Sequence, residues 1–280
     1  MIVVLAIVLV LPFLLGIGLY LQSAMLLNEQ SIFRILFTSK WMPMAGKFGL
    51  LGFILSSLMV TVLSLLIAGP ICLLTAIHLT QYAKKWVLRI MHPVIDILAG
   101  IPSVIYGVWG ILVVVPLVSR HIAPLFGVQT SGYTLLAGSV VLAVMIIPFI
   151  LNILIEVFRN IPSELTEASL ALGATRWQTI KHVIVRKGFP GIISAMGLGV
   201  SRAFGETIAV LMVVGNVATI PTGIFQPGYP LPALIANNYG EMMSIPMYQS
   251  ALMFSALVLF VVVMLFNLAS RIAITRFETK

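Results

Sequence analysis

The segment from Phe189 to Val217 reads FPGIISAMGLGVSRAFGETIAVLMVVGNV, a long apolar run with two charges inside it. A bilayer-spanning helix takes about 20 mainly apolar residues, and this segment is long enough. Arg202 and Glu206 nevertheless lie in its interior. A charge near the centre of a spanning helix costs about 2.5–3.5 kcal/mol on insertion scales, so such residues indicate a transport pathway. The segment predicts a membrane protein with a polar function inside the bilayer.

The composition of the whole chain agrees with that interpretation. Of 280 residues, 60% are hydrophobic and 9% are charged, against about 25% charged in a soluble domain. Too few charges are present to cover a soluble globule, so the lipid bilayer must surround the chain. The net charge of +8 has no accompanying basic stripe with interleaved aromatic residues, so nucleic acid is not an expected partner. Cys72 is the single cysteine and forms no intrachain disulfide.

Six apolar segments predict an all-α, polytopic membrane protein with one transmembrane domain, residues 1–280. The first of them is compatible with a cleaved signal peptide, but it lacks a positively charged start and its apolar run exceeds a usual signal core. A retained first span is therefore favoured. The six expected spans are 2–21, 50–77, 93–118, 133–155, 189–217 and 247–270.

The basic residues in the intervening loops are distributed unequally. One side of the predicted topology carries Lys84, Lys85, Arg89, Arg159, Arg176, Lys181, Arg186, Lys187, Arg271, Arg276 and Lys280. The other side carries only Arg34, Lys40, Lys47 and Arg120. Loops rich in Lys and Arg stay in the cytoplasm. Both termini and the loop 156–188 are therefore expected in the cytoplasm, with the loop 218–246 outside.

Two expected spans contain helix-breaking residues. Gly69-Pro70 and the stretch from Gly100 to Ser103 should each kink or interrupt a helix, because proline removes a backbone donor. Such kinks serve packing in many membrane helices. The alternative is that the second break borders a translocation path, where Ser103 and Tyr106 would donate hydrogen bonds to an anion. Asp96 is expected to pair with a basic residue such as Arg89.

The fifth span carries a small-residue stripe beside its charges, namely Gly197, Ser201, Gly205 and Ala209. Small residues four apart let another helix approach closely. Arg202 and Glu206 have the same spacing and would share one helical face. They either neutralise each other as an ion pair, or Arg202 offers its guanidinium to an oxyanion in transit. The two roles are compatible if the substrate displaces Glu206.

The predicted cytoplasmic loop contains a short helix from Glu164 to Leu172, started near Pro162-Ser163 and ended by Gly173. Its small and polar residues suit docking to a soluble partner. Glu167-Ala168-Ser169, followed by Gly173, resembles the coupling loop of ABC-importer permeases. In that family the loop seats in a groove of the ATPase subunit. Two departures are Ser169, where a second alanine is usual, and Arg186, where proline is common.

Two further motifs narrow the resemblance. Residues 99–107, AGIPSVIYG, and 202–207, RAFGET, are similar to signatures of phosphate-specific (Pst) permeases, and residues 208–216 resemble the C-type subunit more than the A-type. The resemblance implies a type I (MetI-like) importer fold and residence in the cytoplasmic, or inner, membrane. Implied partners are a homologous A-type permease subunit, two ATP-binding cassette subunits and an extracytoplasmic phosphate-binding protein.

Two sets of candidate site residues result. The first would line the substrate pathway: the resemblance implies Arg202 and Glu206, next to Thr207, and the helix break adds Ser103 and Tyr106. The second would couple the chain to the ATPase: Glu164, Glu167, Ala168, Ser169, Gly173 and Ala174. Permeases for tungstate, sulfate or another oxyanion remain the alternative, as does the A-type phosphate subunit.

Other classes of function find less support in the sequence. None of the lysines is followed by Ser or Thr, so a phosphate-cradling P-loop is absent and ATP must be bound by partner subunits. The four histidines stand singly without metal-ligand spacing, and a nucleophile–base pair is missing. We therefore expect no cofactor, metal or catalytic site. A secondary transporter would commonly show inverted repeats with paired broken helices, and a convincing repeat is missing. The proline-rich outer loop is expected to gate the outer mouth or receive the binding protein.

Overall fold

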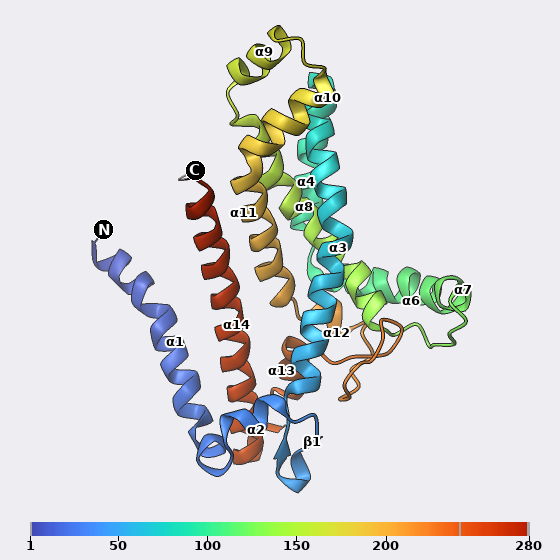
Figure 1. Ribbon diagram of the computed structural model, residues 1–280. Coiled ribbons are helices and arrows are strands. Elements are labelled where there is room, and N and C mark those ends of the chain that lie inside the picture. Colours follow the sequence, from blue (N-terminus) through green and yellow to red (C-terminus); the bar gives the residue numbers. More distant parts are fainter. Residues whose placement is uncertain (1, 241, 279–280) are drawn as a thin grey trace.

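The computed structural model describes residues 2–240 and 242–278 and is almost entirely helical (Figure 1). The α-helices are α1 (Ile2–Glu29), α2 (Ile32–Phe37), α3 (Leu51–Gln81), α4 (Lys85–Gly100), α5 (Ser103–Trp109), α6 (Val115–Leu117), α7 (Ala123–Leu125), α8 (Leu135–Arg159), α9 (Ser163–Ala171), α10 (Arg176–Thr179), α11 (Val185–Phe204), α12 (Ile208–Leu211), α13 (Leu231–Asn238) and α14 (Pro246–Glu278). The strands β1 (Trp41–Met42) and β2 (Lys47–Phe48) pair antiparallel. Short 3₁₀ turns cover Pro43–Ala45 and Met242–Ser244, and π-helical turns cover Gly110–Val114, Val118–Ile122 and Ile180–Ile184.

Six helical segments among the described residues are long and apolar enough to cross a membrane: Leu9–Glu29, Leu51–Gln81, Ser103–Leu125, Leu135–Arg159, Arg176–Phe204 and Pro246–Ile272. The predicted number of spans is confirmed, but three expected spans had wrong limits. The first continues to Glu29 instead of ending at residue 21. The third is Ser103–Leu125 instead of 93–118, because the helix is broken after Gly100. The fifth is Arg176–Phe204 instead of 189–217, because it continues helically from the preceding loop and stops at Phe204.

The centre of the molecule is the packing of α3 against α8, which α11 joins from the side (Figure 1). Glycines permit the close approach of α11: a Cβ on Gly199 would lie 2.6 Å from Ile150 Cδ1 of α8. Leu142, Ile146, Ile150 and Leu154 of α8 are fully buried in this core. The expected interruption at Gly69-Pro70 is wrong, since α3 continues through Pro70 from Leu51 to Gln81. Its long apolar flanks and its packing on α8 hold the helix together.

A second apolar cluster lies at the end of the molecule that bears α2 and the β1–β2 hairpin (Figure 1). Trp41 forms edge-on ring contacts with Phe48, Phe53 and Tyr248, at centroid separations of 5.5, 5.1 and 5.8 Å. Aromatic pairs favour this geometry. The cluster anchors α1 and α14, which pack along each other, to the start of α3.

The third span departs from the direction of its neighbours. Figure 1 shows the segment carrying α6 and α7 projecting to one side of the bundle, roughly across the direction of α3. Its outer surface is apolar, with Leu112 69% and Leu125 84% exposed. An apolar side this exposed is suited to lipid or to another membrane helix, rather than to water.

The loop 218–246 folds back into the bundle. It contains α13, whose first four residues, Leu231 to Leu234, are buried in protein. Two serines of α3 bind the backbone at the start of α13. Ser56 Oγ accepts from the Tyr229 backbone N–H at 3.1 Å, and Ser57 Oγ accepts from the Leu231 backbone N–H at 2.8 Å. Buried backbone donors need such partners.

Candidate functional site

The first half of the candidate site is the break between α4 and α5. Helix α4 ends at Gly100 and α5 begins at Ser103, after Pro102, as the glycine and proline predict. Tyr106 is buried, and its hydroxyl donates to the Leu98 carbonyl at 2.8 Å. The same carbonyl, in the last turn of α4, also accepts from the Ile101 backbone N–H at 3.3 Å. The predicted anion contacts of Ser103 and Tyr106 stay predictions; Tyr106 already uses its proton, and Ser103 is half-buried.

Asp96, one turn before this break, does not pair with Arg89 as expected. Its Oδ1 accepts from the Asn152 side chain at 3.2 Å. Asn152 belongs to α8, so the bond joins α4 to the central core. The sequence did not predict Asn152 as this partner, because hydropathy does not indicate which helix packs beside α4.

The second half of the site is the break between α11 and α12. Helix α11 ends at Phe204 with Gly205 as its C-cap, and α12 begins only at Ile208. Arg202 and Glu206 therefore do not share a helical face, and that prediction is wrong. The four-residue spacing brings side chains together only while the helix continues. Within residues 2–240 and 242–278, Arg202 and Glu206 form no ion pair.

Arg202 lies in the last turn of α11 and is exposed in the isolated chain. Its guanidinium carbon is 5.2 Å from the ring centroid of Phe149 on α8. A cation over an aromatic face gains about 0.5–1 kcal/mol when exposed and about 2 when desolvated. The C-terminal end of a helix also favours a cation. Phe149 holds Arg202 at this place, a role that the sequence did not reveal.

Glu206 and Thr207 lie inside the gap between the two helices. Glu206 is half-buried, and its Oε1 accepts from the Ala209 backbone N–H at 3.4 Å. Thr207 Oγ1 donates to the Gly205 carbonyl at 3.3 Å. Both side chains therefore form hydrogen bonds with backbone groups next to the break, and peptide groups in a membrane need such partners where a helix stops.

The two broken regions pack on one another. Helix α5 contacts α12, and glycines of the third span make the approach possible. A Cβ on Gly107 would lie 2.5 Å from Met212 Sδ, and one on Gly110 would lie 2.7 Å from Val213 Cγ1. Helix α5, which carries Ser103 and Tyr106, thus packs against α12, which directly follows Glu206 and Thr207 in the chain. That these residues and Arg202 line one pathway stays a prediction.

The prediction that small residues of the fifth span contact another helix is confirmed only for Gly197 and Ser201. A Cβ on Gly197 would meet Ser270 of α14, and Ser201 Oγ donates to Asn267 Oδ1 at 2.8 Å. Gly205 and Ala209 lie beyond the end of α11 and continue no helical stripe. The stripe is therefore the α11–α14 contact.

The predicted coupling residues lie at the far end of the molecule from the β1–β2 hairpin, on and after α9 (Figure 1). Helix α9 begins at Ser163, with Pro162 as its N-cap, and none of its residues is buried. Gly173 has φ +84°, a left-handed conformation that glycine adopts without strain. Leu165, Leu170 and Leu172 are 39%, 40% and 89% exposed. This apolar exposure on a protruding helix suits a protein partner.

The turn after α9 is fixed by hydrogen bonds that the sequence had not predicted. Ser169 Oγ lies 2.9 Å from Thr179 Oγ1, and Thr179 is buried. Thr175 and Gln178 form a capping box at the start of α10. The coupling segment is thereby tied to the continuous helical run that leads into α11.

Comparisons with known proteins give a consistent result. A family model described as "binding-protein-dependent transport system inner membrane component" matches residues 68–280. The "Probable ABC transporter permease protein YqgH" of Bacillus subtilis is 41% identical over 253 residues, covering 90% of this chain and 80% of that protein. The "Phosphate transport system permease protein PstC" of Xylella fastidiosa is 35% identical over 273 residues, covering 92% and 83%.

A solved structure extends the likeness to the fold. The "inward facing conformations of the MetNI methionine ABC transporter" include a chain matching 81% of this one and 94% of its own length, with TM-score 0.58 and 20% identity. The six-span architecture is therefore that of a MetI-like ABC permease. The chain belongs to the family of inner membrane components of binding-protein-dependent transport systems.

Proposed function

We propose that this chain is the permease subunit of an ABC importer that moves inorganic phosphate across the cytoplasmic membrane. The main support is the similarity of this chain to phosphate transport permeases over more than nine-tenths of its length. It is 35% identical to the permease of Xylella fastidiosa and 36% identical to the permease of Methanocaldococcus jannaschii. These named relatives favour phosphate over sulfate or tungstate, and the C-type subunit over the A-type.

The substrate pathway runs past the two helix breaks. Arg202 contacts the phosphate through its planar, permanently charged guanidinium. Glu206 and Thr207 lie in the gap beside it, with Ser103 and Tyr106 across the α5–α12 contact. Because Arg202 is not paired with Glu206, an arriving anion has no carboxylate to displace.

Energy comes from ATP hydrolysed on two partner ATPase subunits, and this chain carries no ATPase, cofactor or metal site of its own. Helix α9 and the turn after it, with Glu164, Glu167, Ala168, Ser169, Gly173 and Ala174, dock on one of them. Nucleotide binding moves α9 and shifts the spans between inward-open and outward-open states, a two-state equilibrium that the loaded binding protein also biases.

The remaining partners follow from the same assignment. A homologous A-type permease subunit completes the pathway, and an extracytoplasmic phosphate-binding protein delivers the substrate. Both termini and the loop 156–188 lie in the cytoplasm, and the loop 218–246 lies outside, where it gates the outer mouth or contacts the binding protein. The unequal distribution of Lys and Arg supports this orientation.

The decisive experiment is uptake of labelled phosphate into vesicles that contain the complete complex, with and without ATP. We expect ATP-dependent uptake that excess sulfate or tungstate does not inhibit. Arg202→Ala should abolish uptake while the complex still assembles, and Arg271→Ala, an exposed position on α14, serves as the control. Normal uptake by Arg202→Ala would remove Arg202 from the pathway. Inhibition by sulfate would redirect the substrate assignment.

A further inference from the structure

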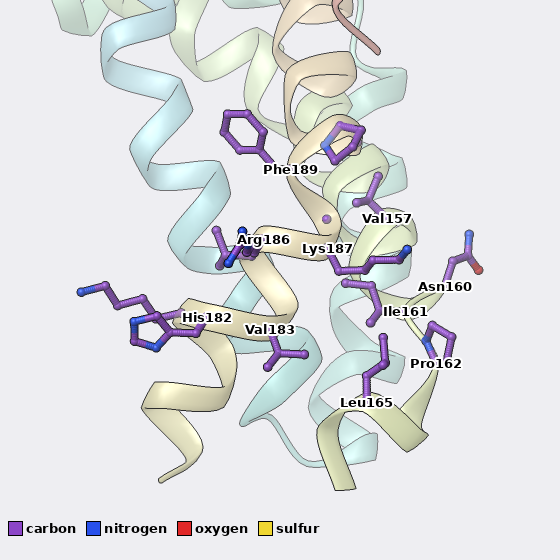
Figure 2. Close-up of a pocket in the computed structure, with 15 residues that line it drawn as sticks. Val157, Asn160, Ile161, Pro162, Leu165, His182, Val183, Arg186, Lys187 and Phe189 are labelled. Atoms are coloured by element: carbon purple, nitrogen blue, oxygen red, sulfur yellow. The ribbon is translucent and has the colours of Figure 1, made fainter. Parts of the chain in front are cut away.

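A cavity of about 1100 Å³ opens between the end of α8, the loop into α9 and the first turns of α11 (Figure 2). It is distinct from the helix breaks that carry Arg202. The fourth span ends at Arg159, and the cavity begins at Val157 and Asn160, on either side of that end. The cavity therefore lies at the level where hydrocarbon gives way to lipid headgroups.

One side of the cavity is apolar because α11 lies close against α8. A Cβ on Gly188 would be 3.0 Å from the Phe158 ring, and one on Gly191 would be 2.5 Å from Val157 Cγ1. Val157 and Ile161 line the cavity from the α8 side, and Pro190 and Gly191 line it from α11. Such a surface fits the upper part of an acyl chain better than a water-soluble ligand.

The charge of the lining is of one sign. None of the 15 lining residues is acidic, whereas Lys181, Arg186 and Lys187 are basic. Figure 2 shows Lys187 reaching from α11 toward the α8 side, between Val157 and Ile161, while Arg186 and His182 point to the opposite side of α11. Lys187 and Asn160 are exposed. Among the described side chains, Lys187 has no carboxylate partner.

We propose that this cavity binds an anionic phospholipid of the leaflet on the α9 side. Its headgroup phosphate pairs with the Lys187 ammonium and lies within reach of the Asn160 amide, and its acyl chain follows the apolar side formed by Val157 and Pro190. Basic pockets between membrane helices at the cytoplasmic surface recognise anionic headgroups in this way. In the orientation proposed above, that leaflet is the cytoplasmic one.

The position of the lipid has a mechanical consequence. The cavity touches both the end of α8 and Leu165 of α9, so a bound lipid bridges the central core and the segment proposed to contact the ATPase. Anionic lipid should thus favour one position of α9 relative to the end of α8. The site does not depend on which solute is transported.

The test is native mass spectrometry of the complete complex with phosphatidylglycerol or phosphatidylcholine. We expect selective retention of phosphatidylglycerol. One Lys near a membrane surface contributes about 1 kcal/mol to anionic lipid binding, so Lys187→Gln should weaken retention about fivefold. Lys187→Arg should restore it. Lys84→Gln, the same change at an exposed lysine outside the cavity, should leave it unchanged.

Each other outcome overturns the proposal. Equal retention by Lys187→Gln and the unchanged chain would exclude the site, as would equal retention of both lipids. Loss of the ATPase subunit from Lys187→Gln, with lipid retention unchanged, would assign the surface to the ATPase. Displacement of bound lipid by inorganic phosphate would assign it to the free anion. Because the readout is lipid mass, failure here is separable from failure of phosphate uptake.

Discussion

At the scale of single residues, the balance of energies around Arg202 favours a transport role. Burial of a charge at mid-membrane costs about 2.5–3.5 kcal/mol. The Phe149 ring offsets about 0.5–2 kcal/mol of this, and the C-terminal end of α11 about 0.3–1. Together they offset about 0.8–3 kcal/mol, which overlaps the lower part of the cost. In the proposed pathway, a guanidinium held this way, with no carboxylate partner among the described side chains, binds a passing anion without first losing an ion pair.

Replacement of Arg202 by lysine tests whether the shape of the cation matters as well as its charge. Lysine keeps the charge but loses the planar, two-pronged donor that suits an oxyanion. We expect Arg202→Lys to need about tenfold more phosphate for half-maximal uptake, as for a lost contact of about 1.4 kcal/mol. Arg202→Gln should abolish uptake. If uptake by the lysine variant depended on phosphate concentration as in the unchanged chain, only the charge at position 202 would matter, and not the shape of the guanidinium.

At the scale of elements, sequence reasoning located the spans but not every place where a helix stops. The break after Gly100 was predictable because glycine and Pro102 both signal it. The break after Phe204 was not, because Ile208 to Val214 continue the apolar run and only Gly205 hints at an end. Hydropathy measures transfer from water and does not record backbone direction. For the same reason the partners Phe149 and Asn152, supplied by α8, could not be foreseen.

The α5–α12 contact can be tested at Gly110. Alanine there would place its Cβ 2.7 Å from both Val141 Cγ2 and Val213 Cγ1. Overpacking a tight core costs about 1–3 kcal/mol, so Gly110→Ala should lower the melting temperature of the purified complex and reduce uptake. At Gly18 of α1 an added Cβ meets nothing within 4 Å, and Gly18→Ala should be neutral or stabilising. A fully active, equally stable Gly110→Ala variant would contradict the close packing.

Helix α9 is tested at Ser169, where the chain departs from the alanine usual in coupling loops. Ser169→Ala removes its hydrogen bond to Thr179 and leaves that buried hydroxyl unpaired, at a cost of about 1–3 kcal/mol. We expect normal assembly but less phosphate imported per ATP hydrolysed, measured in the same vesicles. Ser163→Ala, at the exposed first residue of α9, is the matched control. Unchanged coupling in Ser169→Ala would make the hydrogen bond dispensable.

At the scale of the whole molecule, the two ends differ in chemistry. Helix α9 and the basic loop 156–188 lie at one end, and the aromatic cluster around Trp41 lies at the other (Figure 1). The starts of α3 and α14 share that aromatic cluster, while α9 protrudes without buried residues. A densely packed end and a protruding end suit the proposed mechanism, in which the ATPase acts on the protein at α9. The proposed coupling role of α9 requires that its end of the molecule faces the cytoplasm.

Site-directed labelling determines that orientation directly. Cys72 is the single cysteine and is fully buried, so Cys72→Ala gives a background without a reactive thiol at small cost in packing. On it, Lys47→Cys in β2 and Arg176→Cys in α10 place thiols at exposed positions near opposite ends. In intact cells stripped of their outer wall, a membrane-impermeant maleimide should label only Lys47→Cys; after the membrane is opened, it should label both. Labelling of Arg176→Cys in intact cells would place α9 outside the cell, where no ATPase subunit can reach it. That result would contradict both the proposed orientation and the coupling role of α9.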